Sequence, residues 1–208
     1  MKRVARWLCV CLAAWASGTA AAVLEVTVGG GAGAPLAHAV VYARAARAVA
    51  AAPAPTPAIV QRQKAFHPFV SVIQAGTAVA FPNEDTVRHH VYSFSPAKVF
   101  ELKLYIGTPR EPVLFDKTGV VVLGCNIHDQ MLAYVVVVET PFFAKTDAAG
   151  RAVLELPEQQ YAVAAWHPSM PNATVLPQPF AEVRVPAQRA VRAVLQVSGA
   201  APAHRSPH

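Results

Sequence analysis

Short apolar runs separated by turn-forming residues dominate the chain after its first 22 residues. The runs are rich in Val, Phe, Tyr and Leu, and clusters of Gly, Pro, Asn and Asp lie between them. This alternation is typical of β-strands joined by tight turns. It predicts an all-β protein with strands at residues 23–28, 39–43, 69–73, 77–81, 90–94, 99–104, 120–123, 132–139, 152–156, 161–166, 181–185 and 191–197.

Helices are disfavoured by the 18 prolines of the chain, because proline cannot donate a backbone hydrogen bond. One Ala-rich stretch, residues 43–52, is short and leads into a segment in which every second residue from 53 to 57 is proline. We predict a loop or linker there, with at most a turn of helix. The final residues, 199–208, are expected to be disordered.

The first 22 residues follow another pattern. Lys2, Arg3 and Arg6 precede an apolar run from residue 7 to about 15, and small residues follow as far as Ala22. A basic start, a short apolar core and an A-x-A site predict a secretory signal peptide that is cleaved after Ala22. The apolar run is too short to span a bilayer comfortably. We therefore expect a periplasmic mature chain that has no transmembrane segment.

Charge and cysteine content change if this peptide is removed. Three of the 18 basic residues would leave, so 15 would face 12 acidic residues and the net charge would be +3. No dense Lys/Arg stripe remains, which argues against nucleic-acid binding. Cys9 and Cys11 would leave as well, so Cys125 would be unpaired in an oxidising compartment. Metal ligation would explain such a thiol, and a buried inert cysteine is the alternative.

The segment that follows the apolar run at residues 120–123 carries candidate metal ligands. Cys125, His128 and Met131 lie within seven residues of one another. Two imidazoles and a thiolate, with a weak axial thioether, form the ligand set of a blue-copper site. The second imidazole has to come from elsewhere, and the adjacent pair His89 and His90 offers it. Neighbouring residues on a strand point to opposite faces, so both can hardly bind one ion.

The spacing of these residues resembles the cupredoxins, which are Greek-key β-sandwiches that hold type 1 copper. The C-x-x-H-x-x-M loop has the short spacing seen in amicyanin, and a glycine lies six residues before the cysteine. The pattern N-x-D-x-x-x-H-x-V at residues 83–91 resembles the strand that supplies the first histidine, and longer stretches resemble bacterial proteins labelled methylamine utilisation proteins. The resemblance implies one copper ion with the ligands His89, Cys125, His128 and Met131, and His90 is the alternative first ligand.

Segments on either side of this region resemble a carboxypeptidase regulatory-like, or transthyretin-like, β-sandwich. They are residues 26–42 and 145–166, where a T-D-x-x-G turn leads into a strand that ends in L-P. We predict that residues 23–57 and 141–198 form a second, discontinuous sandwich and that residues 58–140 form the cupredoxin domain. The alternative is one enlarged sandwich with extra edge strands.

The expected function is that of a one-electron carrier, and the expected partner is a periplasmic c-type cytochrome or dehydrogenase. Alternatives are a copper-delivery protein without redox turnover and a structural interaction module. No hydrolase or P-loop motif appears, so we expect no enzyme. Asp129 and Gln130 predict a more polar docking surface than cupredoxins usually have. A second H-x-x-M, His167 to Met170, lacks a cysteine and is expected to be structural, whereas Asn83 and Asp85 are expected to fix a turn.

Overall fold

The computed structural model describes residues 22–47, 56–177, 181–186 and 189–197. These residues are mostly β-strand, with one short 3-10 turn, η1 (Gly31–Gly33), so the predicted all-β class is confirmed. None of them belongs to a helix that is long and apolar enough to cross a membrane. In chain order the strands are β1 (Ala22–Gly29), β2 (Val40–Ala45), β3 (Val60–Arg62), β4 (Ala65–His67), β5 (Val70–Gln74), β6 (Thr77–Val79), β7 (His89–Ser95), β8 (Lys98–Tyr105), β9 (Val113–Phe115), β10 (Gly119–Gly124), β11 (Leu132–Val138), β12 (Phe143–Lys145), β13 (Arg151–Leu156), β14 (Gln159–Trp166), β15 (Ala181–Val185) and β16 (Val191–Gln196).

Every strand predicted from the apolar runs is present, whereas β3, β4, β9 and β12 were not predicted. Each of these four has only three residues, which is too short for a clear alternation. The loop predicted for residues 43–52 is wrong at its start. Ala43 is fully buried in β2 and pairs with Val163, because its small side chain fits between two sheets. The rest of that stretch from residue 48, the predicted signal peptide up to residue 21 and the tail at 199–208 lie outside the described residues.

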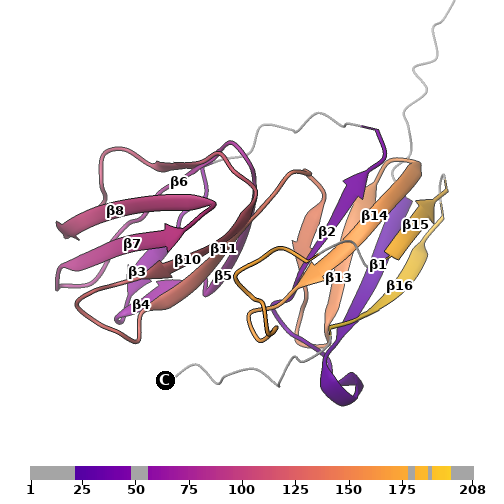
Figure 1. The fold of residues 1–208 in the computed structure, drawn as a ribbon, viewed down its shortest axis with the longest axis horizontal. Coiled ribbons are helices and arrows are strands. Elements are labelled where there is room, and N and C mark those ends of the chain that lie inside the picture. Colours follow the sequence, from indigo (N-terminus) through magenta and orange to yellow (C-terminus); the bar gives the residue numbers. More distant parts are fainter. Residues whose placement is uncertain (1–21, 48–55, 178–180, 187–188, 198–208) are drawn as a thin grey trace, which may run out of the picture.

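The middle of the chain builds the left-hand part of the molecule in Figure 1. Its main sheet has five strands in the order β5-β11-β10-β7-β8, and the pairs β3–β4 and β6–β9 lie against it. Alternate residues of β10 face this core, where Val121 and Leu123 are fully buried beside Phe81 and Phe115. One face of the strand is therefore committed to packing, which fixes its register.

Strands from both ends of the chain build the right-hand part. A three-stranded sheet, β13-β1-β16, faces a four-stranded sheet, β12-β2-β14-β15. Strand β1 shows the reason, because Leu24, Val26 and Val28 are fully buried between the sheets while the residues between them are more exposed. The resemblance of this second sandwich to carboxypeptidase regulatory-like domains stays a prediction.

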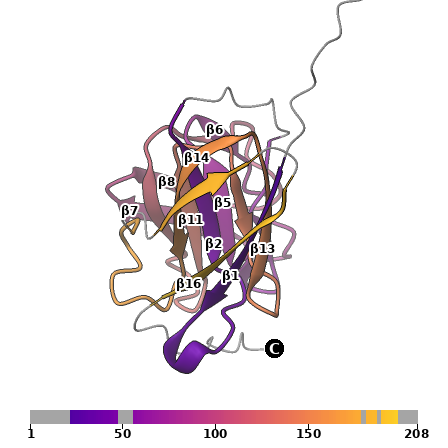
Figure 2. The ribbon, with the colours of Figure 1, turned by 90° about the vertical axis from the view of Figure 1, so that its right-hand side faces the viewer.

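The two parts contact each other through the outer faces of two sheets. Val40 and Trp166 of the four-stranded sheet pack against Val120 and Val136 of the five-stranded sheet. The side chain of Lys145 adds a polar link, since its Nζ donates to a backbone carbonyl of β5 at 2.9 Å. Figure 2 views the second sandwich from the front, and the part built around the five-stranded sheet lies behind it. This apolar contact involves β5, β11 and β10 of the five-stranded sheet, and no residue of β7 or β8 belongs to it.

Candidate metal centre

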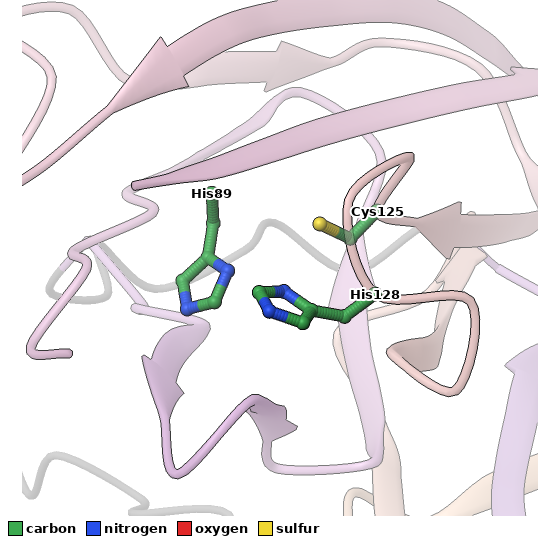
Figure 3. A group of neighbouring side chains, drawn as sticks. All are labelled: His89, Cys125 and His128. Carbon is green, nitrogen blue, oxygen red and sulfur yellow. The ribbon is translucent and has the colours of Figure 1, made fainter. Parts of the chain in front are cut away.

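Three residues that are far apart in the sequence meet at one end of the five-stranded sheet. His89 begins β7, Cys125 directly follows β10, and His128 lies in the loop between β10 and β11. One potential ligand atom from each lies within 4.8 Å of the others. Figure 3 shows both imidazole rings and the sulfur around a common space. The pairing of Gly124 with Tyr92 brings the end of β10 beside the start of β7, so sheet register creates this group.

The donor atoms of this group are buried and lack partners among the described residues. His89 is fully buried and Cys125 is 3% exposed. The Nδ1 atoms of His89 and His128 have no hydrogen-bond partner in this part of the chain, and the thiol is free. An unpaired buried polar atom costs free energy, so two of them in one small space indicate a ligand site. Two imidazole nitrogens and a thiolate fit copper, which these residues could hold.

Asp85 fixes the orientation of the first imidazole. Its Oδ2 lies 2.7 Å from His89 Nε2, and the N–H groups of Gln63 and Lys64 donate to the same carboxylate at 2.6 and 2.9 Å. Burial would raise the pKa of Asp85, but the hydrogen bonds from Lys64, His89 and Gln63 hold that pKa below its usual value. The carboxylate is therefore ionised at neutral pH and accepts a proton-bearing Nε2. This assigns the tautomer of His89 that leaves Nδ1 free to bind a metal.

The turn before β7 is held by Asn83. Its Oδ1 accepts a hydrogen bond from the Asp85 N–H at 3.0 Å, and its Nδ2 donates to the carbonyls of Val87 and Tyr105, each at 2.9 Å. The expected role of Asn83 in this turn is confirmed. The turn-fixing role expected for Asp85 is wrong, because its carboxylate does not cap its own turn and instead joins the β3–β4 turn to His89.

His90 lies outside the group. It occupies an irregularity in the pairing of β7 with β8, and its Nε2 is 2.9 Å from Oε1 of Glu101, without the angles of a hydrogen bond. Its ring packs on Tyr92, with 5.8 Å between ring centroids. The structure thus brings His89, and not His90, to Cys125 and His128, although the assignment of either as a ligand stays a prediction.

Met131 completes the predicted set. It is 1% exposed and packs in the same core cluster as Cys125. Its N–H donates to the carbonyl of His128 at 2.9 Å, so residues 128–131 form one tight turn. The turn keeps the thioether and the imidazole on one short loop at the end of the sheet.

Two polar residues near the group, the buried Gln61 and the half-buried Tyr105, were missed by the sequence analysis. Gln61 is fully buried, its Nε2 donates to the hydroxyl of Tyr105, and that hydroxyl donates to the carbonyl of Phe81 at 2.7 Å. Burial raises the pKa of Tyr105 to about 12, against a lowering hydrogen bond from Gln61, and negative charge at Cys125 adds a smaller upward shift. The phenol therefore stays neutral. No signal in the sequence marked Gln61, because it belongs to a three-residue strand.

Comparison with known proteins gives matches only among solved structures. No family model and no curated protein matches this chain. A Cu-containing nitrite reductase from Thermus scotoductus is 27% identical over 46% of this chain, with a TM-score of 0.38. A purple cupredoxin from Nitrosopumilus maritimus is 24% identical over 39% of this chain, with a TM-score of 0.35. Amicyanin from Paracoccus versutus is 20% identical over 46% of this chain, with a TM-score of 0.34.

These matches differ in how much of the other protein they include. They cover 98% of the purple cupredoxin and 90% of the amicyanin, but only 25% of the nitrite reductase. All three matches have TM-scores below 0.5 and extend over less than half of this chain. An electron-transfer role for this chain therefore has to be argued from the chain's own residues.

Proposed function

We propose that this chain is a type 1 copper protein that carries single electrons in the periplasm. The observation that carries the proposal is the group of His89, Cys125 and His128, whose donor atoms lie within 4.8 Å of one another while two imidazole nitrogens have no partner among the described residues. Copper bound there would supply one-electron redox chemistry. In this proposal Cys125 gives the thiolate, His89 and His128 give Nδ1, and Met131 gives the axial thioether.

The surroundings of the group support a carrier over a delivery protein. Fast electron exchange needs a site that changes little between two oxidation states, so rigid, buried ligands favour it. His89 and Met131 are at most 1% exposed, and Asp85 holds the His89 ring through a network of hydrogen bonds. A delivery protein has to hand its ion to an acceptor, and such buried ligands would slow that transfer.

An apolar surface around His128 would serve the proposed redox partner. Val87, Ile106 and Ile127 are 41%, 56% and 50% exposed and lie on the loops that carry or adjoin the ligands. Asn83 ties two of these loops together through its hydrogen bonds to the carbonyls of Val87 and Tyr105. Asp129 and Gln130 are exposed too, so the surface combines apolar and polar side chains. A c-type cytochrome or a periplasmic dehydrogenase is the class of partner that we propose.

Two rates measured on one copper-loaded sample test the proposal. We expect an intense visible absorption band, fast electron exchange with a c-type cytochrome, and slow transfer of Cu(I) to an acceptor protein. Slow electron exchange together with fast metal transfer would reject the carrier in favour of a delivery protein. Sequencing the N-terminus of the exported protein tests the location, and a start at residue 23 is the expected result.

A further inference from the structure

A groove lies beside the metal centre, on the outer face of the five-stranded sheet. It has a volume of ≈ 540 Å³, and β7 and β10 supply its sheet side, whereas Thr174 comes from the loop after β14 of the second sandwich. On β10, Val120 belongs to the contact between the sandwiches, and Val122, two residues further on the same face, lines the groove. The groove therefore continues the apolar contact surface at the point where the second sandwich ends.

One wall of the groove is aromatic and open to solvent. Phe94 is 80% exposed, and its cross-strand neighbour Val99 is 65% exposed. The ring of Phe94 lies next to that of Tyr92, with 5.1 Å between their centroids and 44° between their planes. Contiguous exposed apolar side chains of this kind mark binding surfaces.

The floor of the groove depends on a glycine. A Cβ on Gly124 would lie 2.8 Å from Cζ of Tyr92, so the phenol ring rests directly on the Gly124 backbone. Any other residue would push the ring outwards into the groove. Gly124 precedes Cys125, so a molecule on this floor lies beside the residue that carries the thiol.

The polar groups define the chemistry of an occupant. The groove is lined by the hydroxyl-bearing Tyr92, Ser95 and Thr174 and by Asp129, and none of the described Lys, Arg or His residues lines it. A carboxylate accepts hydrogen bonds, so an occupant with a donor group would complement Asp129. A lining without cations in this part of the chain disfavours carboxylate and phosphate ligands. The volume falls in the range of about 300–1,000 Å³ that is usual for small-molecule sites.

We propose that this groove binds a small aromatic molecule with a hydroxyl group and no negative charge, of the phenol and quinol class. The ring would stack against Phe94 and Tyr92, and the hydroxyl would donate to Asp129. Binding itself needs no metal, whereas a role for the ligand as an electron source rests on the proposed function. The two ideas can therefore fail separately.

The test uses the full mature chain, without metal and loaded with zinc, and p-cresol and hydroquinone as probes. Nuclear magnetic resonance signals of Tyr92, Gly124 and Phe94 should shift saturably, with a dissociation constant of about 1 mM or less. Benzoate, which carries a negative charge, should bind at least about tenfold more weakly than p-cresol. Equal or tighter binding of benzoate, or no shift of these signals at millimolar p-cresol, would overturn the proposal.

Variants separate the groove from the rest of the surface. Phe94→Ala should weaken p-cresol binding by about fivefold or more, and Thr174→Trp should abolish it by filling the space. Both positions are exposed, so the fold should survive, and circular dichroism checks this. Leu114→Ala is the matched control, because Leu114 is 48% exposed and does not line the groove. If Leu114→Ala weakens binding as much as Phe94→Ala, or if both groove variants bind normally, the site is wrong.

Discussion

The chain contains two H-x-x-M turns that are alike locally and differ in their surroundings. In the first, Met131 N–H donates to the His128 carbonyl at 2.9 Å, and in the second Met170 N–H donates to the His167 carbonyl at 3.0 Å. The Nδ1 of His128 has no partner among the described residues and lies near His89 and Cys125. The H-x-x-M motif alone therefore does not predict a metal site. The difference lies in whether the imidazole nitrogens already have hydrogen-bond partners.

The second turn satisfies its own imidazole. The Nδ1 of His167 lies 2.6 Å from Ser169 Oγ and accepts the Ser169 N–H at 3.2 Å. Burial lowers the pKa of His167, against a raising backbone hydrogen bond at Ala37, and nearby His38 lowers the pKa further. The ring is thus a neutral, hydrogen-bonded part of the second sandwich. This agrees with the structural role that we expected for the second H-x-x-M.

The largest effect should follow from removing the thiol. Cys125→Ser should abolish the intense visible band of the copper-loaded chain, because that band is a thiolate-to-copper charge transfer. His167→Gln, the matched change in the other turn, should leave the band unchanged. Visible absorption spectra of both variants check this, and a Cys125→Ser variant that keeps its colour would refute the site.

Substitutions of the adjacent histidines, His89 and His90, should differ almost as strongly in their effect on the coloured copper site. His89→Ala should lose the coloured site, since His89 supplies one of the donor atoms within 4.8 Å. His90→Ala should retain copper and colour, because the ring of His90 packs on Tyr92 outside the group. Copper titrations followed by absorption measure both, and the reverse result would assign the ligand to His90.

A smaller effect is expected from the carboxylate that holds His89. Asp85→Asn keeps the shape but weakens the hydrogen bond to Nε2, and should lower copper affinity by about 10- to 100-fold while the band remains. Glu101→Gln is the control, since Glu101 lies beside His90. Competition with a chelator gives both affinities. If Asp85→Asn and the parent chain bound copper with equal affinity, the hydrogen bond between Asp85 and His89 would not contribute to copper binding.

The smallest effect should come from the second turn and concerns stability alone. Since the pKa of His167 is lowered in the folded chain from 6.5, the unfolded chain binds the proton more readily. Stability contributed by the neutral ring is present above pH 6.5 and is lost as the pH falls below it. His167→Gln should cost about 1–2 kcal/mol at neutral pH through lost hydrogen bonds. It should also flatten this part of the pH dependence, as urea unfolding of the metal-free chain at several pH values would show. If the free energy of unfolding of His167→Gln changed with pH in parallel with that of the parent chain, the neutral state assigned to His167 would be contradicted.

Local sequence patterns were enough to predict many of the strands and turns of this protein. The apolar runs predicted the longer strands, because a half-buried strand repeats every two residues. The spacing of Cys125, His128 and Met131 predicted a loop with soft ligands, because one tight turn keeps its ends close. The same local reasoning gave a turn at Asn83, whose amide bonds to its own neighbours.

Contacts between distant segments decided the rest. Sheet register placed His89 rather than His90 beside Cys125, and Asp85 joined His89 to the turn between β3 and β4. The packing of one sandwich on half of a sheet left the groove at Phe94 open. Such contacts depend on the energies of many long-range pairs, and no short stretch of sequence records them. The sequence by itself determined the donor chemistry and the strands, and the tertiary structure decided which donors meet, because a lone pair is free or satisfied according to what lies within about 3 Å of it.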